Sequence, residues 1–195
     1  MTLHVDPSDT ALVLIDIQNG TLAFPLSPYG REDLIGRSAE LCRAFMEAGA
    51  MIVKVRIAFS PDGGDRLSQA VDMPMMLPEG GFPDGWSDIA PEIDKFPAAL
   101  TITKRQWSAF FGTELDLQFR RRGIRTVVLA GIATNFGVES TARDGWQLGY
   151  AMVIAEDACT SLGADMHEFA IGKTLPRVSR ILATSDIANA FSQAT

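Results

Sequence analysis

The chain has 195 residues, 47% of them hydrophobic, and its 17 basic and 24 acidic side chains give a formal net charge of −7 at pH 7. A chain of this size can bury one proper core, so we expect a single domain over residues 1–195. The negative charge, with no basic stripe to offset it, argues against nucleic acid as a partner. No apolar run reaches the roughly 18 residues of a membrane span. The first residues lack the pattern of a secretory signal, so we expect a cytoplasmic protein with no membrane partner.

Apolar runs and amphipathic stretches alternate along the chain, separated by short joins. The apolar runs predict strands at residues 11–15, 51–56, 99–103, 126–130, 150–155 and 177–182. The amphipathic stretches predict helices at residues 31–49, 112–122, 137–148, 165–175 and 184–191, the last capped by Thr184. A strand, a helix and a strand with short joins form a right-handed crossover between parallel strands. We therefore expect a Rossmann-like, three-layer α/β/α fold with a six-stranded parallel sheet.

Asp16 stands at the end of the first predicted strand. Open α/β sheets bind ligands at the carboxyl ends of their strands, so Asp16 is a candidate site residue. It could instead cap a turn, because the segment Asp16-Ile-Gln-Asn-Gly has the composition of one. Lys104 follows the third strand in the same way, although a lone lysine after a strand is usually solvated.

Residues 60–97 interrupt the alternation with six prolines and five glycines. We interpret them as an irregular excursion over the edge of the sheet that binds substrate. The apolar side chains expected to anchor it are Met73, Met75, Met76, Phe82 and Trp86. Alternatively, these side chains simply pin the excursion to the core or to a second subunit.

The strand predicted at Val127–Ala130 runs through a glycine-bearing turn, Gly131–Phe136, into a helix that starts at Gly137. Such a junction gathers backbone N–H groups at one point, which attracts anions and developing negative charge. Gly137 occupies the place where a nucleophile would stand, and it has no side chain to offer.

The densest basic run, Arg120–Arg122 with Arg125, is typical of a helix C-terminus, where cations suit the helix dipole. A patch for a phosphate or a partner is the alternative. Cys42 and Cys159 do not form a disulfide framework in a chain of this size. We interpret both as buried structural residues, the alternative for Cys159 being a substitute nucleophile.

The signature of the isochorismatase-like hydrolases, also called the cysteine hydrolase family, reads Gly-Ile-Ala-Thr-Asn-x-Cys-Val-x-x-Thr-Ala-x-Asp. This chain resembles it at Gly131-Ile-Ala-Thr-Asn-Phe, Val138, Thr141-Ala142 and Asp144. The resemblance runs from the Leu14-Ile-Asp-Ile-Gln segment to Ile187 and implies the fold of that family. Gly137 stands in place of the nucleophilic cysteine. The isochorismatases proper, and a group of uncharacterised relatives that the chain resembles more closely, also have glycine there.

By this resemblance, Asp16 is the proton-transfer group and Lys104 its electrostatic partner. The segment from Lys104 to Phe110 resembles the Lys-x-x-x-Ser-Ala-Phe element of the family. The amides of Ala133 and Gly137 are expected to form an oxyanion pocket. The aromatic side chains that we expect to wall the site are Phe24, Trp107 and Phe136.

The resemblance implies two further properties. The peptide between Ile132 and Ala133 is expected to be cis, as it usually is in the family. The protein is also expected to form a homo-oligomer, a dimer or a larger assembly, with a small molecule as its substrate.

Without a thiol at Gly137, covalent amidase chemistry is disfavoured. Glycine there suits the hydrolysis of a vinyl ether or a related bond, in which the aspartic acid protonates the substrate and water adds. We therefore predict a non-covalent hydrolase for a small, anionic molecule. Isochorismate itself is not expected, because the Trp-Gly-Pro-Gly element of the isochorismatases is missing. The alternative is a catalytically silent homologue that binds a ligand or only oligomerises.

No cofactor and no metal are expected. Related nicotinamidases hold zinc with an Asp and two His after the second strand, and here residues 58–64 contain no histidine. The two histidines, His4 and His167, are too dispersed for such a site. His167 is expected at the surface or behind the site.

Overall fold

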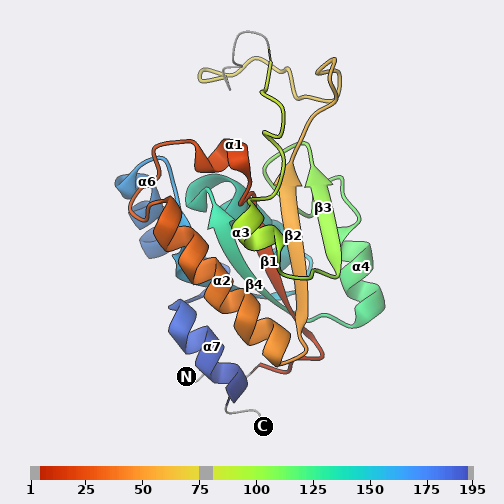
Figure 1. The fold of residues 1–195 in the computed structure, drawn as a ribbon, viewed down its shortest axis with the longest axis vertical. Coiled ribbons are helices and arrows are strands. Elements are labelled where there is room, and N and C mark those ends of the chain that lie inside the picture. The colour runs from red at the N-terminus through yellow and green to blue at the C-terminus, as the bar shows by residue number, and fades with distance from the viewer. Residues whose placement is uncertain (1–4, 75–80, 193–195) are drawn as a thin grey trace.

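The structure, a computed structural model, describes residues 5–74 and 81–192. Within these residues, six parallel strands form one sheet in the order β3-β2-β1-β4-β5-β6, with helices on both faces (Figure 1). The strands are β1 (Thr10–Ile15), β2 (Met51–Ile57), β3 (Leu100–Lys104), β4 (Thr126–Ile132), β5 (Ala151–Thr160) and β6 (Arg180–Leu182). The predicted three-layer α/β/α fold with a six-stranded parallel sheet is confirmed.

The helices are α1 (Asn19–Leu22), α2 (Arg31–Glu47), α3 (Pro91–Asp94), α4 (Leu115–Arg122), α5 (Glu139–Gln147), α6 (Ala164–Phe169) and α7 (Thr184–Ser192). Two hydrophobic cores lie on opposite faces of the sheet. Leu12 and Leu14 of β1 face the core that includes Phe45 of α2. Ala11, Val13 and Ile15 of the same strand face the other core, which includes Phe119 of α4. Because both faces of β1 are buried, its sequence is a continuous apolar run.

The largest differences from the sequence prediction lie in the C-terminal half. β5 continues to Thr160 because, after a register shift, its last residues pair with the end of β4. The helix predicted from residue 165 breaks into α6, a π-helical turn and a 3₁₀ turn that contains Pro176. That 3₁₀ turn takes up Arg177, so β6 is shorter than predicted.

The predicted capping role of Thr184 is wrong. The Ile187 N–H donates to the Ala183 carbonyl, which makes Thr184 the first residue of α7 rather than its cap. The Thr184 Oγ1 atom is buried without a hydrogen-bond partner among the described residues. Its backbone N–H donates instead to Asp157 Oδ1 at 2.7 Å. This N–H, which has no partner within the helix, is therefore satisfied by a carboxylate from β5.

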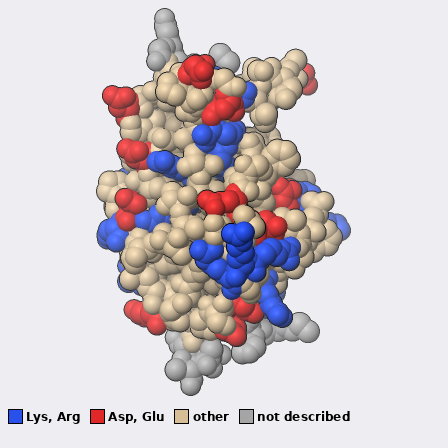
Figure 2. Space-filling model, turned by 90° about the vertical axis from the view of Figure 1, so that its right-hand side faces the viewer, with Lys and Arg blue, Asp and Glu red and all other residues tan. Residues whose placement is uncertain are grey.

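The arginine run falls in the last turn of α4, which Gly123 ends in a left-handed conformation (φ 70°). This is the helix C-terminus that the sequence predicts. Arg120 pairs with Asp116 one turn earlier, at 3.1 Å. Figure 2 shows the side of the molecule on which α4 lies, where basic side chains gather at the centre and acidic ones flank them.

The excursion leaves the sheet after β2 and returns through α3. Its described parts project beyond the ends of β2 and β3 (Figure 1). The ring centroid of Phe82 lies 4.1 Å from that of Trp86 and 5.9 Å from that of Phe59. The Trp86 indole also packs against Gly20 of α1, so Trp86 links the excursion to the rest of the chain. Met73 is 92% exposed, so it does not anchor the excursion to the described part of this chain, and a contact with a second subunit stays a prediction. Met75 and Met76 lie outside the described residues.

Candidate active site

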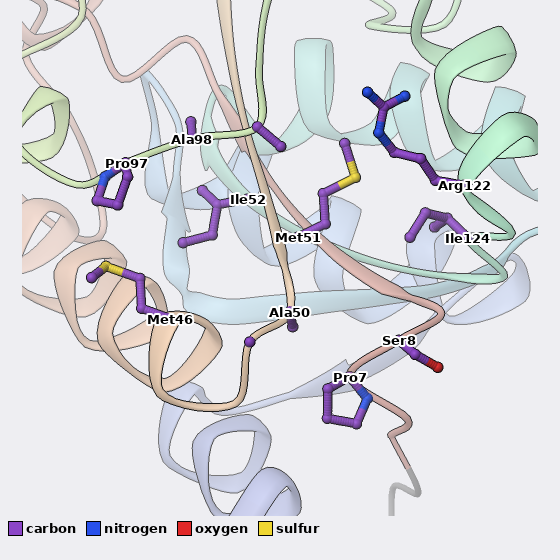
Figure 3. A pocket seen from close by; sticks show the side chains of 12 residues that line it. Pro7, Ser8, Met46, Ala50, Met51, Ile52, Pro97, Ala98, Arg122 and Ile124 are labelled. Carbon is purple, nitrogen blue, oxygen red and sulfur yellow. The ribbon is translucent and has the colours of Figure 1, made fainter.

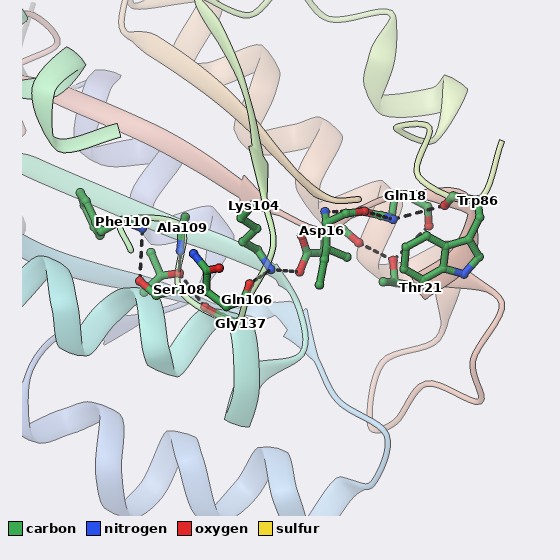
Figure 4. Close-up of polar contacts among 12 residues, drawn as sticks. Asp16, Gln18, Thr21, Trp86, Lys104, Gln106, Ser108, Ala109, Phe110 and Gly137 are labelled. Carbon is green, nitrogen blue, oxygen red and sulfur yellow. Dashed lines mark hydrogen bonds and ion pairs between the residues drawn. The ribbon is translucent and has the colours of Figure 1, made fainter. Parts of the chain in front are cut away.

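The structure brings Asp16 and Lys104 together at the carboxyl edge of the sheet. Lys104 Nζ donates a hydrogen bond to Asp16 Oδ2 at 2.6 Å, and a second one to the Gln106 carbonyl at 3.1 Å (Figure 4). The two side chains come from the ends of β1 and β3, which β2 separates in the sheet. Both residues are buried, with 5% of Asp16 and 1% of Lys104 exposed. The predicted ion pair is therefore present, whereas its catalytic role stays a prediction.

Asp16 owes its position to the way the chain leaves β1. Its backbone N–H still pairs with Val55 of β2 at 2.9 Å, but its φ is +50°. Among the described residues it is the non-glycine residue with a left-handed backbone, a conformation that requires enforcement by its surroundings. Its carbonyl accepts a hydrogen bond from Thr21 Oγ1 in α1. The sharp turn at Asp16 thus takes the chain out of the sheet at the residue that meets Lys104.

Burial raises the pKa of Asp16 from 3.8 to about 6, and the nearby Lys104 ammonium opposes this rise without cancelling it. A carboxyl group with a pKa near 6 can give or take a proton close to neutral pH. Its Oδ1 atom is buried and has no hydrogen-bond partner among the described residues. One carboxyl oxygen is therefore held by Lys104, and the other makes no hydrogen bond within the described part of the chain.

The signature turn connects the end of β4 to α5. Gly131 has a φ of 127°, and a Cβ there would overlap the Ile15 carbonyl, so a side chain at this position is excluded. The Ile132–Ala133 peptide is cis, as the resemblance predicts. The chain then forms a π-helical turn, Thr134–Val138, before α5 begins. Turns of this kind are frequently found at functional sites.

Gly137 faces the ion pair. A Cβ built on Gly137 would lie 3.4 Å from Asp16 Oδ2, 3.1 Å from the Ile132 carbonyl and 3.0 Å from Ile15 Cγ2. A cysteine here would consequently place its side chain beside the Asp16 carboxyl group. The Gly137 carbonyl accepts a hydrogen bond from Thr141 Oγ1 at 2.7 Å. The position of the missing nucleophile is therefore part of the same constellation as Asp16 and Lys104.

The predicted aromatic residues are brought together in part. The ring centroids of Trp107 and Phe136 lie 5.0 Å apart. Trp107 follows Lys104 by three residues, and Phe136 directly precedes Gly137. Trp107 is 55% exposed, so the pair offers an open apolar surface next to the site. Phe24 follows α1 and is 48% exposed. A pocket walled by all three stays a prediction.

Two cavities formed by the described residues lie away from this ion pair. The cavity in Figure 3, of about 550 Å³, is at the opposite edge of the sheet, where Met51 begins β2 and Arg122 ends α4. A second one, of about 620 Å³, is lined by Arg56, Asp88 and Lys95 among others. Neither is lined by Asp16 or Lys104. The low exposure of both residues shows that the ion pair is almost closed off within the described chain.

Some residues around the site escaped the sequence analysis. Gln18 is fully buried, and its side-chain amide bonds to Ile57 and Trp86. The signal was its place two residues after Asp16, in the segment that carries the resemblance. Thr134 contacts His167 Nδ1 through its Oγ1 at 2.8 Å.

His167 is 3% exposed, which rules out the surface position and leaves the one behind the signature turn. Burial lowers the pKa of this histidine. Cys42 and Cys159 are buried, as predicted, and burial raises the pKa of each thiol to about 12. A thiol with such a pKa is a poor nucleophile.

In the part of the chain that the structure describes, no three His, Cys, Asp or Glu side chains gather closely enough to hold a metal ion. None of the described helices combines the length and the apolar character that crossing a membrane requires.

Comparison with known proteins agrees with this geometry. A family model for the isochorismatase domain matches residues 10–186. The chain is 42% identical to the uncharacterized isochorismatase family protein YecD of Escherichia coli O157:H7, over 97% of this chain and all of that one. It is 33% identical to the ureidoacrylate amidohydrolase RutB of Variovorax paradoxus, over 84% of this chain and 72% of that protein.

Solved structures show the same architecture. An isochorismatase family protein from Burkholderia thailandensis superimposes with a TM-score of 0.90 at 36% identity, covering 98% of this chain and all of that one. A cysteine hydrolase from Pseudomonas syringae pv. phaseolicola 1448A has a TM-score of 0.80 at 19% identity, over 99% of this chain and 97% of that one, and supports the fold alone. The chain belongs to the isochorismatase family of hydrolases.

Proposed function

We propose that the protein hydrolyses a small, anionic molecule without a covalent intermediate, with Asp16 as the general acid and base. The observation that carries this proposal is the buried pair of Asp16 and Lys104 beside Gly137. An acid with a pKa of about 6 is present, and the position that would hold a nucleophilic thiol has no side chain.

The reaction that suits these groups is the hydrolysis of a vinyl ether or a related bond. The proton of Asp16 goes to the terminal carbon of the vinyl group, and the ether oxygen supplies the electrons that stabilise the resulting cation. Water adds to this cation, and Asp16, now a carboxylate, takes the proton that the water loses. The adduct then breaks down into a ketone or aldehyde and an alcohol. Each proton that Asp16 gives is returned, so no covalent bond to the protein is needed.

Lys104 has two roles in this proposal. Its ammonium stabilises the Asp16 carboxylate after proton transfer and keeps the carboxyl group oriented. Its positive charge also favours an anionic substrate. The amides of Ala133 and Gly137, the predicted oxyanion pocket, bind a negatively charged group of the substrate. Phe24, Trp107 and Phe136 contact its apolar part.

We further propose that the chain belongs to a subgroup of the family that lacks the nucleophilic cysteine, because Gly137 stands at the position of that residue in the signature. The two native cysteines do not replace it, because both are buried and their thiol pKa values are raised to about 12. The ureidoacrylate amidohydrolase among the relatives supports hydrolysis as the reaction class.

A panel of small anionic vinyl ethers, esters and amides tests the proposal, with turnover followed by mass spectrometry of the products. Asp16→Asn should lower turnover by about 10²- to 10⁴-fold, the usual contribution of a positioned general acid. The matched variants Lys104→Met and Lys54→Met distinguish the loss of the lysine at the site from the loss of a buried lysine elsewhere in the core. Lys54 is also buried and ion-paired, with Asp94 at 2.9 Å, but it stands behind α3. We expect Lys104→Met to lower turnover strongly and Lys54→Met to leave it close to that of the wild type.

Equal turnover by the wild type and Asp16→Asn would refute the role of Asp16. A protein that converts none of the panel would favour a catalytically silent homologue that binds a ligand or only oligomerises.

A further inference from the structure

The side chain of Gln18 lies fully buried between two segments that border the candidate site. Its Oε1 accepts a hydrogen bond from the Ile57 N–H at 2.8 Å, and its Nε2 donates to the Ile57 carbonyl at 3.0 Å. The same Nε2 also donates to the Trp86 carbonyl at 3.2 Å. The oxygen and both N–H groups of the amide are thus engaged with backbone groups of distant segments (Figure 4).

Gln18 completes the β1–β2 pairing where β1 has already left the sheet. The parallel register places Ile15 opposite Val55, and the Asp16 N–H bonds to the Val55 carbonyl. Beyond that point Asp16 turns away with its φ of +50°, so no backbone of β1 reaches Ile57. The side-chain amide of Gln18 takes its place and satisfies both the N–H and the carbonyl of Ile57. Without it, these buried polar groups would lack a partner, which is unfavourable.

The third hydrogen bond ties the returning limb of the excursion, residues 85–90, to the same point. The Trp86 carbonyl also accepts from the Gly20 N–H at 2.9 Å, and the Asn19 N–H donates to the Asp88 carbonyl at 2.9 Å. The Trp86 indole packs so closely on Gly20 that a Cβ there would overlap it. Residues 17–20 therefore hold both the end of β2 and the returning limb directly after Asp16.

We propose that Gln18 is a positioning residue that holds Asp16 in its buried place against Lys104 by joining the end of β2 and the returning limb into one unit. The catalytic meaning of this role rests on the proposed function. The structural claim, that Gln18 fixes the environment of Asp16, does not. Gln18 is not a catalytic residue, because its amide is used up by the protein backbone.

The carboxyl ¹³C signal of Asp16, followed by NMR from pH 3 to pH 8 without any substrate, tests this claim. Among the described residues, Lys104 is the charged group that acts on Asp16, and burial is the larger effect. When Gln18 is replaced by leucine, Asp16 should gain access to water, and its pKa should fall from about 6 toward 3.8.

Asn19→Ala is the matched control. The Asn19 side chain donates to the Gly85 carbonyl, so its loss weakens the same limb without touching Ile57. In this variant, limited proteolysis of the excursion should become faster while the pKa of Asp16 stays near 6. Should Gln18→Leu fail to fold, Gln18→Met decides, since it keeps the length of the side chain, adds no charge, and loses the acceptor for the Ile57 N–H and both donors. It should move the pKa of Asp16 in the same direction.

An Asp16 pKa that stays near 6, or rises, in a folded Gln18 variant would overturn the proposal. Turnover provides a separate readout, because Gln18→Leu should lower kcat more than it raises KM. If Asp16→Asn leaves turnover unchanged but Gln18→Leu shifts the Asp16 pKa, the proposed function fails and the positioning role stands.

Discussion

The Asp16 carboxyl group should make the protein less stable as the pH rises, and Asp16→Asn should remove this effect. The pKa of Asp16 is about 6 in the folded chain against 3.8 as a model value, so between these values the folded state keeps a proton that the unfolded state has lost. Stability is therefore fully present below pH 3.8 and is lost as the pH rises through 6. At 1.36 kcal/mol for each unit of pKa, the loss is about 3 kcal/mol, of which about 2 kcal/mol falls between pH 4 and pH 7.

Urea denaturation of the wild type and Asp16→Asn at several pH values from 4 to 7 measures this difference. With a slope of about 2 kcal/mol per molar urea, the midpoint of the wild type should fall by about 1 M relative to the variant. Asp62→Asn is a control. Asp62 is exposed, and its hydrogen bond from Ser60 lowers its pKa, so its stabilising effect is lost only as the pH falls below 3.8. The difference in urea midpoint between Asp62→Asn and the wild type should not change between pH 5 and pH 7.

A difference between the wild type and Asp16→Asn that does not change with pH would refute the reasoning. A wild type that gains stability over the variant as the pH rises would show that the attraction of Lys104 outweighs burial. In that case Asp16 is a permanent carboxylate and is unsuited to the role of a general acid near neutral pH.

Three further predictions follow from the geometry. Gly137→Cys places a thiol beside Asp16 and Lys104. Peptide mapping should show that this thiol reacts with iodoacetamide at least about 10-fold faster than Cys42 or Cys159. Equal labelling of all three thiols would contradict this placement. Gly20→Ala should push the Trp86 indole away and lower the free energy of unfolding by about 1–3 kcal/mol in urea, whereas an unchanged midpoint would mean that Trp86 moves freely. Sedimentation at micromolar concentration should give a mass well above the 21.1 kDa of one chain, and a monomer mass would remove the predicted homo-oligomer.

The elements of the fold that could be predicted are those in which one local signal dominates. β1 and β4 are buried on both faces, so their apolar runs identify them without reference to the rest of the chain. The end of β5 could not be found in this way, because Glu156 and Asp157 interrupt its apolar run. It is held in the sheet by pairing with β4 beyond a register shift, which is a tertiary effect.

The candidate site was predictable in its charged members and not in its supports. Asp16 and Lys104 stand at strand ends that a parallel sheet brings to one edge. The role of Gln18 depends on the left-handed turn at Asp16, which composition does not reveal. The sequence left two positions open for His167, at the surface or behind the site, because its contact with Thr134 spans 33 residues of sequence.

The most direct test of the proposed mechanism asks whether turnover requires a thiol. The protein is treated with iodoacetamide, and turnover of the converted substrate is measured together with the intact mass of the protein during the reaction. We predict that turnover stays at the level of the untreated protein and that no adduct of substrate mass appears, because Asp16 and water carry the chemistry. Loss of turnover through alkylation of Cys159, or a substrate adduct on that residue, would contradict the non-covalent mechanism.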